Sequence, residues 1–219
     1  FKLSSRFEPP STSARQLTRL VRQEVRDTLE RGGDWRDAVD GLRPITIKLW
    51  QALQEHEQGR FLSRLRPYWD IHRHRAAAEV YEVLNRRRNQ SGLQITAGRI
   101  LTLRCNANGI EAQVAPRGLA QPQLVRAAYV VNCIGPQRDV RRSNSPLLRQ
   151  LVAKGHIMPD ALRLGLMCDD KGRVLDSTGR TTRPIHALGP LRVGELWESV
   201  AVPELRVQAA ELADSLLSA

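Results

Sequence analysis

The sequence of 219 residues lacks a G-x-G-x-x-G run, a long apolar stretch and an acidic excess. Without G-x-G-x-x-G, the chain has no loop of the kind that normally binds a dinucleotide pyrophosphate at a helix N-terminus. No apolar run approaches the roughly 20 residues of a membrane helix. Residues 1–11 contain no apolar core of a signal peptide. These absences predict a globular chain in the cytoplasm that neither spans nor binds a membrane. Since the first residue is Phe1, we also expect a cut or processed fragment.

Cysteine is scarce as well. The three cysteines are widely separated and lie within apolar runs, at Cys105, Cys133 and Cys168. This pattern predicts reduced, buried thiols of a cytosolic protein. No pair has the C-x-x-C spacing of a dithiol reductase.

Acidic side chains are fewer than basic ones, with 23 Asp and Glu against 34 Lys and Arg, which gives a formal net charge of +11. The basic excess is spread along the chain, which is typical of a solvated surface or of a field that attracts anionic cofactors. Aromatic residues make up only 5% of the sequence, and the only tight basic run is Arg86–Arg88. Nucleic-acid binding is therefore not favoured.

The first part of the chain is predicted to be helical. Apolar residues recur at helical spacing over 11–31, where Ser11 or Ser13 can cap the start. Asp34 is predicted to cap a short helix that follows. Residues 45–66 continue as helix with an interruption at Gly59, and a further helix covers about 75–89.

The pattern changes at residue 93, where alternating apolar residues predict strands and residues 106–109 predict a hairpin turn. We expect a long apolar strand over 127–135, a second small hairpin over 164–176, and a final strand over 184–189. Helices are predicted after Ser145 and from about 203 to 217. The fold class is therefore α+β, with a helical segment over 1–92 and a mixed segment over 93–219.

Two of the apolar runs end in glycine, at Gly135 and Gly189, and Gly194 precedes the last helix. A strand that ends in glycine before a helix N-terminus presents bare backbone amides and a partial positive charge. Phosphates, carboxylates and the electron-rich end of a flavin bind at such points. The pattern predicts a sheet that contributes to a cofactor site.

Four strings carry a family resemblance: DWRDAVDGLRPITIKLWQAL, RFLSRLRPYWDIHRHR, VVNCIGP and HALGPLRVGELWESVAVPELRVQA. Over residues 15–217 the chain resembles the C-terminal half of bacterial FAD/NAD(P)-binding proteins with two dinucleotide-binding domains, which are similar to flavin-containing monooxygenases. The resemblance implies a helical insert and the closing piece of a Rossmann-like FAD domain. It also implies glycine loops for FAD and the nicotinamide ahead of Phe1, so the chain alone is not expected to retain FAD or be active.

The resemblance also assigns cofactor-binding residues. Gly135 resembles the glycine of the strand beneath the flavin nucleotide, and Gly189 resembles the glycine of the final strand motif. Pro190 stands where that motif has an Asp for the ribityl chain, and Glu195 is a nearby substitute carboxylate. Residues from Gly194 through Trp197 to Glu198 are then implied to approach the N1/C2 carbonyl end of the flavin.

The densest polar cluster is His72, Arg73, His74 and Arg75. Its guanidiniums and imidazoles can hold a phosphate or a substrate carboxylate, or they can form a helix cap bonded to backbone carbonyls. No third ligand accompanies the two histidines, so no metal site is predicted. Trp197 and Glu198 likewise can line a pocket or can serve packing and the helix dipole.

Two functions follow. The first is an FAD-dependent oxidoreductase of the monooxygenase or hydroxylase type, in which NAD(P)H reduces the flavin and the flavin reduces oxygen or a substrate. Its partners are the preceding dinucleotide-binding domains or a second copy of the chain. The second is a non-catalytic α+β binding or interaction module derived from that fold. No catalytic residue is assigned.

Overall fold

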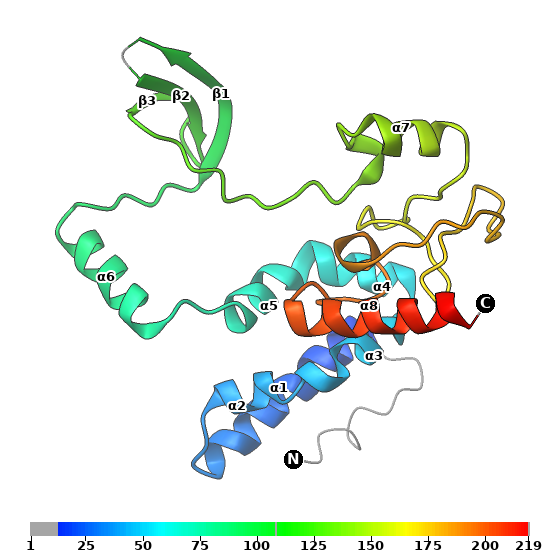
Figure 1. Ribbon diagram of the computed structural model, residues 1–219. Coiled ribbons are helices and arrows are strands. Elements are labelled where there is room, and N and C mark those ends of the chain that lie inside the picture. Colours follow the sequence, from blue (N-terminus) through cyan, green and yellow to red (C-terminus); the bar gives the residue numbers. More distant parts are fainter. Residues whose placement is uncertain (1–12, 108, 219) are drawn as a thin grey trace. The chain divides into compact units, whose positions relative to one another are not determined.

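The computed structural model describes residues 13–107 and 109–218, which form a mixed α+β fold (Figure 1). The chain divides into two compact units. The described part of the larger unit consists of residues 13–74 and 137–218, and the smaller unit consists of residues Arg75–Pro136. The predicted division at residues 92 and 93 falls inside the smaller unit.

The larger unit begins with helix α1, Ala14–Glu30, which confirms the first predicted helix. The Ser13 side chain accepts a hydrogen bond from the Gln16 amide, and Gln16 accepts from the Ser13 amide in return. This reciprocal cap satisfies amides that the first turn leaves unpaired. Ser11, the alternative cap, lies outside the described residues. Asp34 caps helix α2, Trp35–Asp40, in the same reciprocal way, as predicted.

The next helical stretch breaks at a different place from the predicted one. Helix α3, Thr46–Gln51, and helix α4, Glu55–Arg60, are separated at residues 52–54, and Gly59 lies within α4. A π-helical turn over Phe61–Leu65 then leads into helix α5, Arg66–Arg73. The prediction of a break at Gly59 was wrong because a single glycine weakens a helix without ending it when its face packs on a core.

The C-terminal part of the larger unit contains two further helices. Helix α7, Pro146–Ala153, is capped by Ser145 as predicted, and helix α8, Val202–Leu217, confirms the last predicted helix. Short 3₁₀ helices cover Val140–Arg142 and Gly189–Arg192.

The larger unit is held together by apolar clusters that join distant parts of the chain. One buried cluster brings Trp50 and Leu53 against Leu164, Val193 and Trp197. A second is formed entirely by the C-terminal part, from Val140, Ile157, Leu166, Val174 and Ala187. The first cluster fixes the residues before α8 against the N-terminal helices.

The smaller unit contains helix α6, Ala78–Asn89, and a three-stranded antiparallel sheet in the order β1-β2-β3. Strand β1 is Gly98–Asn106, β2 is Gly109–Pro116 and β3 is Gln123–Ala127. Asn106 pairs with Gly109, so the hairpin predicted at residues 106–109 is confirmed.

Two predicted strands are absent from the described residues. The run predicted as a strand over 127–135 has no strand after Ala127, and residues 184–189 form only one isolated bridge, between Arg173 and His186. The hairpin predicted over 164–176 is reduced to a bridge between Cys168 and Val174. Apolar runs indicate a preference for extended backbone, but a strand also needs a neighbouring strand to bond with.

The prediction that all three cysteines are buried was also wrong. Cys105 and Cys133 are exposed, and only Cys168 is partly covered. Cys105 lies on a fully exposed strand, and Cys133 lies in the run that forms no strand.

Burial raises the pKa of the Cys168 thiol to about 12. Since only the thiolate is nucleophilic, we expect iodoacetamide at neutral pH to label Cys105 and Cys133 at least about tenfold faster than Cys168. Mass spectrometry of peptides from timed reactions measures the three rates. In urea the three rates should converge, and equal rates in the folded chain would contradict the expectation.

Candidate functional site

The candidate site is a cavity of about 440 Å³ in the larger unit, called the basic cavity below. Four arginines, one histidine and three carboxylates line it: Arg43, Arg66, Arg73, Arg138, His74, Asp70, Glu198 and Glu204. Its apolar lining includes Ile47, Val193, Trp197, Val200 and Ala201. Helices α3 and α5 and the residues before α8 therefore supply the wall.

Glu198 connects α5 to the residues that precede α8. The Trp69 indole N–H donates to Glu198 Oε1 at 2.6 Å, and Arg73 Nε donates to Oε2 at 3.2 Å. His74 Nε2 lies 3.6 Å from Oε1. Glu198 has a φ of +65°, which is uncommon for a residue with a Cβ. The contacts of its side chain with Trp69 and Arg73 anchor the residue in this backbone conformation.

Two further ion pairs lie in the cavity wall, one between distant segments and one within α5. Arg43 Nη2 donates to Glu204 Oε1 at 2.9 Å, and Arg66 Nε lies 3.3 Å from Asp70 Oδ2. The Arg43 guanidinium holds the pKa of the Glu204 carboxyl below its usual range, so this carboxylate is ionised at neutral pH.

Arg138 differs from the other three arginines. It forms no hydrogen bond or ion pair with any described residue, and its side chain is partly buried. Burial, and then the like charge of Arg66, lower the pKa of the Arg138 guanidinium. The cavity thus has one cation that the described part of the chain does not neutralise.

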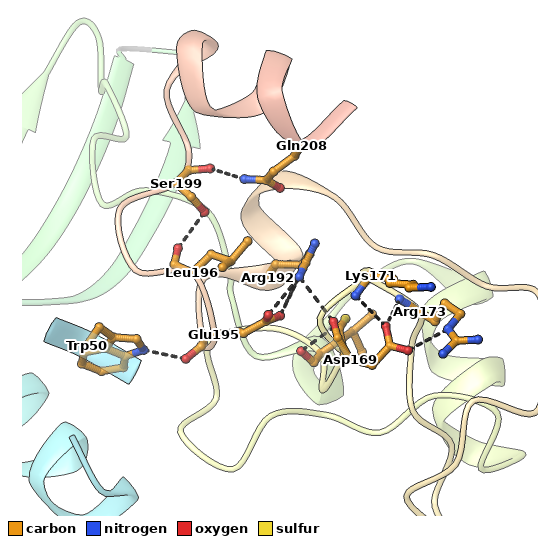
Figure 2. Close-up of polar contacts among 12 residues, drawn as sticks. Trp50, Asp169, Lys171, Arg173, Arg192, Glu195, Leu196, Ser199 and Gln208 are labelled. Atoms are coloured by element: carbon orange, nitrogen blue, oxygen red, sulfur yellow. Dashed lines mark hydrogen bonds and ion pairs between the residues drawn. The ribbon is translucent and has the colours of Figure 1, made fainter. Parts of the chain in front are cut away.

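A pair of stacked indoles lies beside the cavity. The rings of Trp50 and Trp197 are 4.8 Å apart, and the Trp50 indole N–H donates to the Gly194 carbonyl at 2.7 Å (Figure 2). The Trp197 indole N–H is buried and has no acceptor among the described residues. Both rings contribute burial, but only Trp50 contributes a hydrogen bond.

This difference predicts unequal effects of the same substitution. We expect Trp50→Phe to lower the free energy of unfolding by about 1–3 kcal/mol more than Trp197→Phe, because only the former leaves a carbonyl without its donor. Urea unfolding followed by circular dichroism measures both values. The two variants are mutual controls because each removes the same volume, and equal losses would contradict the assignment.

Two residues that the resemblance assigns to flavin are occupied by bonds within the chain. The Gly189 amide donates to the Gln208 side chain at 2.8 Å. Gln208 in turn donates to the Ser199 carbonyl, as Figure 2 shows. Glu195 is bonded by Arg192, with Nη2 2.9 Å from Oε1 (Figure 2). Burial raises the pKa of the Glu195 carboxyl despite this pairing.

The remaining predicted residues lie in different surroundings. Gly135 has a φ of +83° and belongs to the smaller unit, as does Arg75. Pro190 lies in the 3₁₀ helix and is exposed. His72 Nδ1 lies 2.7 Å from the Tyr68 carbonyl, and the imidazole packs edge-on against Trp35.

The structure therefore brings Arg73 and His74 together with Trp197 and Glu198. Sequence reasoning missed the other charged residues of the cavity: Arg43, Arg66, Asp70, Arg138 and Glu204. Each is a single charge on a helix or loop with no motif around it. A useful signal was the string DIHRHR, because a gathering of cations predicts acids elsewhere that balance them.

A second, apolar cavity of about 700 Å³ adjoins this site, since Thr46 and Trp197 line both. Its other walls come mainly from α1, α3 and α5. Within residues 13–107 and 109–218, no cluster of three or more His, Cys, Asp or Glu side chains is placed to hold a metal ion. In the same residues, no helix is long and apolar enough to cross a membrane.

Comparison of this chain with protein-family models, with curated proteins and with solved structures finds no match.

Proposed function

We propose that this chain is the C-terminal part of an FAD-dependent, NAD(P)H-using oxidoreductase of the monooxygenase or hydroxylase type, and that it supplies the substrate cavity. One observation carries the proposal. Arg73 and His74 share a cavity with Trp197 and Glu198, although more than a hundred residues separate the two segments. The resemblance implies that the second segment approaches the flavin, so a substrate bound in the basic cavity would lie near it.

The described residues do not fit the flavin itself. The Gly189 amide already donates a hydrogen bond to Gln208, and the Glu195 carboxylate is already paired with Arg192. Pro190 has no backbone N–H that it could donate to a cofactor. The proposal therefore assigns FAD binding, and a Rossmann-like fold around it, to dinucleotide-binding domains outside this chain. When bound there, the flavin supplies the redox chemistry, and this chain binds and orients the substrate.

The test uses the full-length gene product. After gel filtration it should retain flavin, visible in its absorbance spectrum, and it should oxidise NADH or NADPH. As a control, the chain of 219 residues mixed with FAD should elute without it. A full-length product that neither retains flavin nor oxidises a nicotinamide with added FAD rejects the proposal.

The alternative, a non-catalytic interaction module, is supported by the smaller unit. Tyr129, Val131 and Ile134 are 87%, 80% and 91% exposed, in a run that forms no strand. Such a run is suited to pairing with the edge of a partner sheet.

We therefore expect the chain to self-associate as its concentration rises, and Val131→Glu to weaken that association at least about tenfold. Sedimentation velocity measures both. The exposed Glu82→Gln on α6 is the control. A chain that stays monomeric at all concentrations contradicts self-association through this run, which the module requires and which the oxidoreductase fragment also allows.

A further inference from the structure

We propose that the basic cavity binds a small organic monoanion with an apolar body, of the aromatic carboxylate class, and that Arg138 is the cation that binds its carboxylate. This inference deepens the proposed function and rests on it for the role of the ligand as substrate. The binding itself needs no flavin.

The first step is the balance of charge. Four guanidiniums and three carboxylates line the cavity. Each carboxylate has its own arginine: Glu204 pairs with Arg43 at 2.9 Å, Asp70 with Arg66 at 3.3 Å, and Glu198 with Arg73 at 3.2 Å. Arg73 also lies 3.9 Å from Asp40, which is outside the lining. Among the four guanidiniums that line the cavity, only Arg138 has no carboxylate of its own, so a ligand with a single negative charge can pair with it.

The Arg138 guanidinium is itself in an unfavourable environment. A guanidinium that is partly removed from water and has no anionic partner is unfavourable, as the lowered pKa of Arg138 reflects. Among the described residues, the charge of Asp70 offsets part of this cost, but Asp70 is paired with Arg66 and forms no hydrogen bond or ion pair with Arg138. A bound carboxylate offers two oxygens in the geometry that a guanidinium prefers.

The third step is that the chain holds Arg138 in place through its neighbours. Asp139 is buried, accepts from the Arg141 amide and caps the 3₁₀ helix Val140–Arg142. Val140 is buried in the second apolar cluster. The backbone at residue 138 is therefore fixed before any ligand arrives, as a binding site requires.

The fourth step is the apolar wall. Val193 and Trp197 are buried residues of the first core cluster, and Ile47, Val200 and Ala201 complete this side. A hydrated inorganic ion gains nothing from such a wall, whereas a ring buries apolar surface on it. The volume of about 440 Å³ lies within the usual range of ligand pockets.

The experiment measures binding to the purified chain by isothermal titration calorimetry, with benzoate as the probe. Benzamide has the same shape without the charge, acetate has the charge without the ring, and phenyl phosphate carries more charge. We expect benzoate to bind at least about tenfold more tightly than each of these three. Arg138→Gln should weaken benzoate binding about tenfold or more, and Arg138→Lys should recover part of it. The exposed Arg149→Gln on α7 is the matched control.

Arg138→Gln should also leave the urea midpoint unchanged or raise it, because it removes an unpaired cation. Four results overturn the inference: no benzoate binding, equal binding of benzamide, preferred binding of phenyl phosphate, or unfolding caused by Arg138→Gln. Because the titration contains no cofactor, these results do not bear on the flavin. Conversely, a full-length product without flavin rejects the oxidoreductase and leaves the binding result intact.

Discussion

Gly165→Ala should destabilise the larger unit by more than about 3 kcal/mol, the largest effect that we expect from a single methyl group. Gly165 has a φ of +149°, and a Cβ built there would lie 2.1 Å from the Leu191 carbonyl oxygen. The clash is with backbone, so no side chain can rotate away to relieve it. The same strand-like contact lets the Leu166 amide donate to that carbonyl at 2.8 Å.

The matched control is Gly179→Ala. Gly179 also has a positive φ, +77°, but its missing Cβ would meet nothing within 4 Å. The substitution should cost about 1 kcal/mol, from backbone conformation alone. Urea midpoints of the two variants separate steric exclusion from conformational strain. Similar losses for both would show that the contact between Gly165 and Leu191 is not as close as described.

The contact between Gly165 and Leu191 also affects the basic cavity. Leu191 lies two residues before Val193, which belongs to both the first apolar cluster and the cavity wall. A displaced Leu191 therefore disturbs the segment that carries Trp197 and Glu198. We expect Gly165→Ala to lose benzoate binding together with stability, whereas Gly179→Ala should keep it.

The helices could be predicted from the sequence because their signals are local. Ser13, Asp34 and Ser145 each stand directly before an apolar repeat at helical spacing, and each caps the helix that was expected. The hairpin at residues 106–109 is local in the same way, since two short strands and their turn are contiguous.

The strands expected over 127–135 and 184–189 depend on partners that are not contiguous. A central parallel strand is recognised by its apolar run, but the run does not specify the strand that pairs with it. In this structure, Tyr129, Val131 and Ile134 are exposed instead of covered. The sheet expected to contribute to a cofactor site depended on these two runs. The Rossmann-like domain that the resemblance implies stays a proposal.

The candidate site was partly predictable for a related reason. The cluster from His72 to Arg75 was expected to hold a phosphate or a substrate carboxylate, or to form a helix cap. In the structure a carboxylate of the chain itself, Glu198, pairs with Arg73 and lies near His74. The sequence around Arg138 gives no comparable signal, because this arginine is distinguished only by the absence of a bonded partner among the described residues. A sequence shows which charges are present, but only the structure shows which of them remain unpaired.

Arg73→Gln should reveal whether this pair supports the fold or binds a ligand. The Arg73 and Glu198 side chains are only 15% and 13% exposed, so the variant leaves a largely buried carboxylate without its arginine partner. We expect a loss of about 2–4 kcal/mol in the free energy of unfolding. Glu198→Gln in the same chain should recover part of that loss, because it removes the unpaired charge while its amide oxygen can still accept from Trp69.

Arg73→Gln and Arg138→Gln remove the same charge from the same cavity, and their expected results are opposite. The first should lower the urea midpoint strongly, and the second should weaken benzoate binding at an unchanged or higher midpoint. If Arg73→Gln instead keeps the midpoint and abolishes benzoate binding, then Arg73 is a ligand-binding cation. Glu198 would in that case release Arg73 when the carboxylate arrives. Because Glu198 stays in the lining, the number of charges there and the preference for a monoanion would not change.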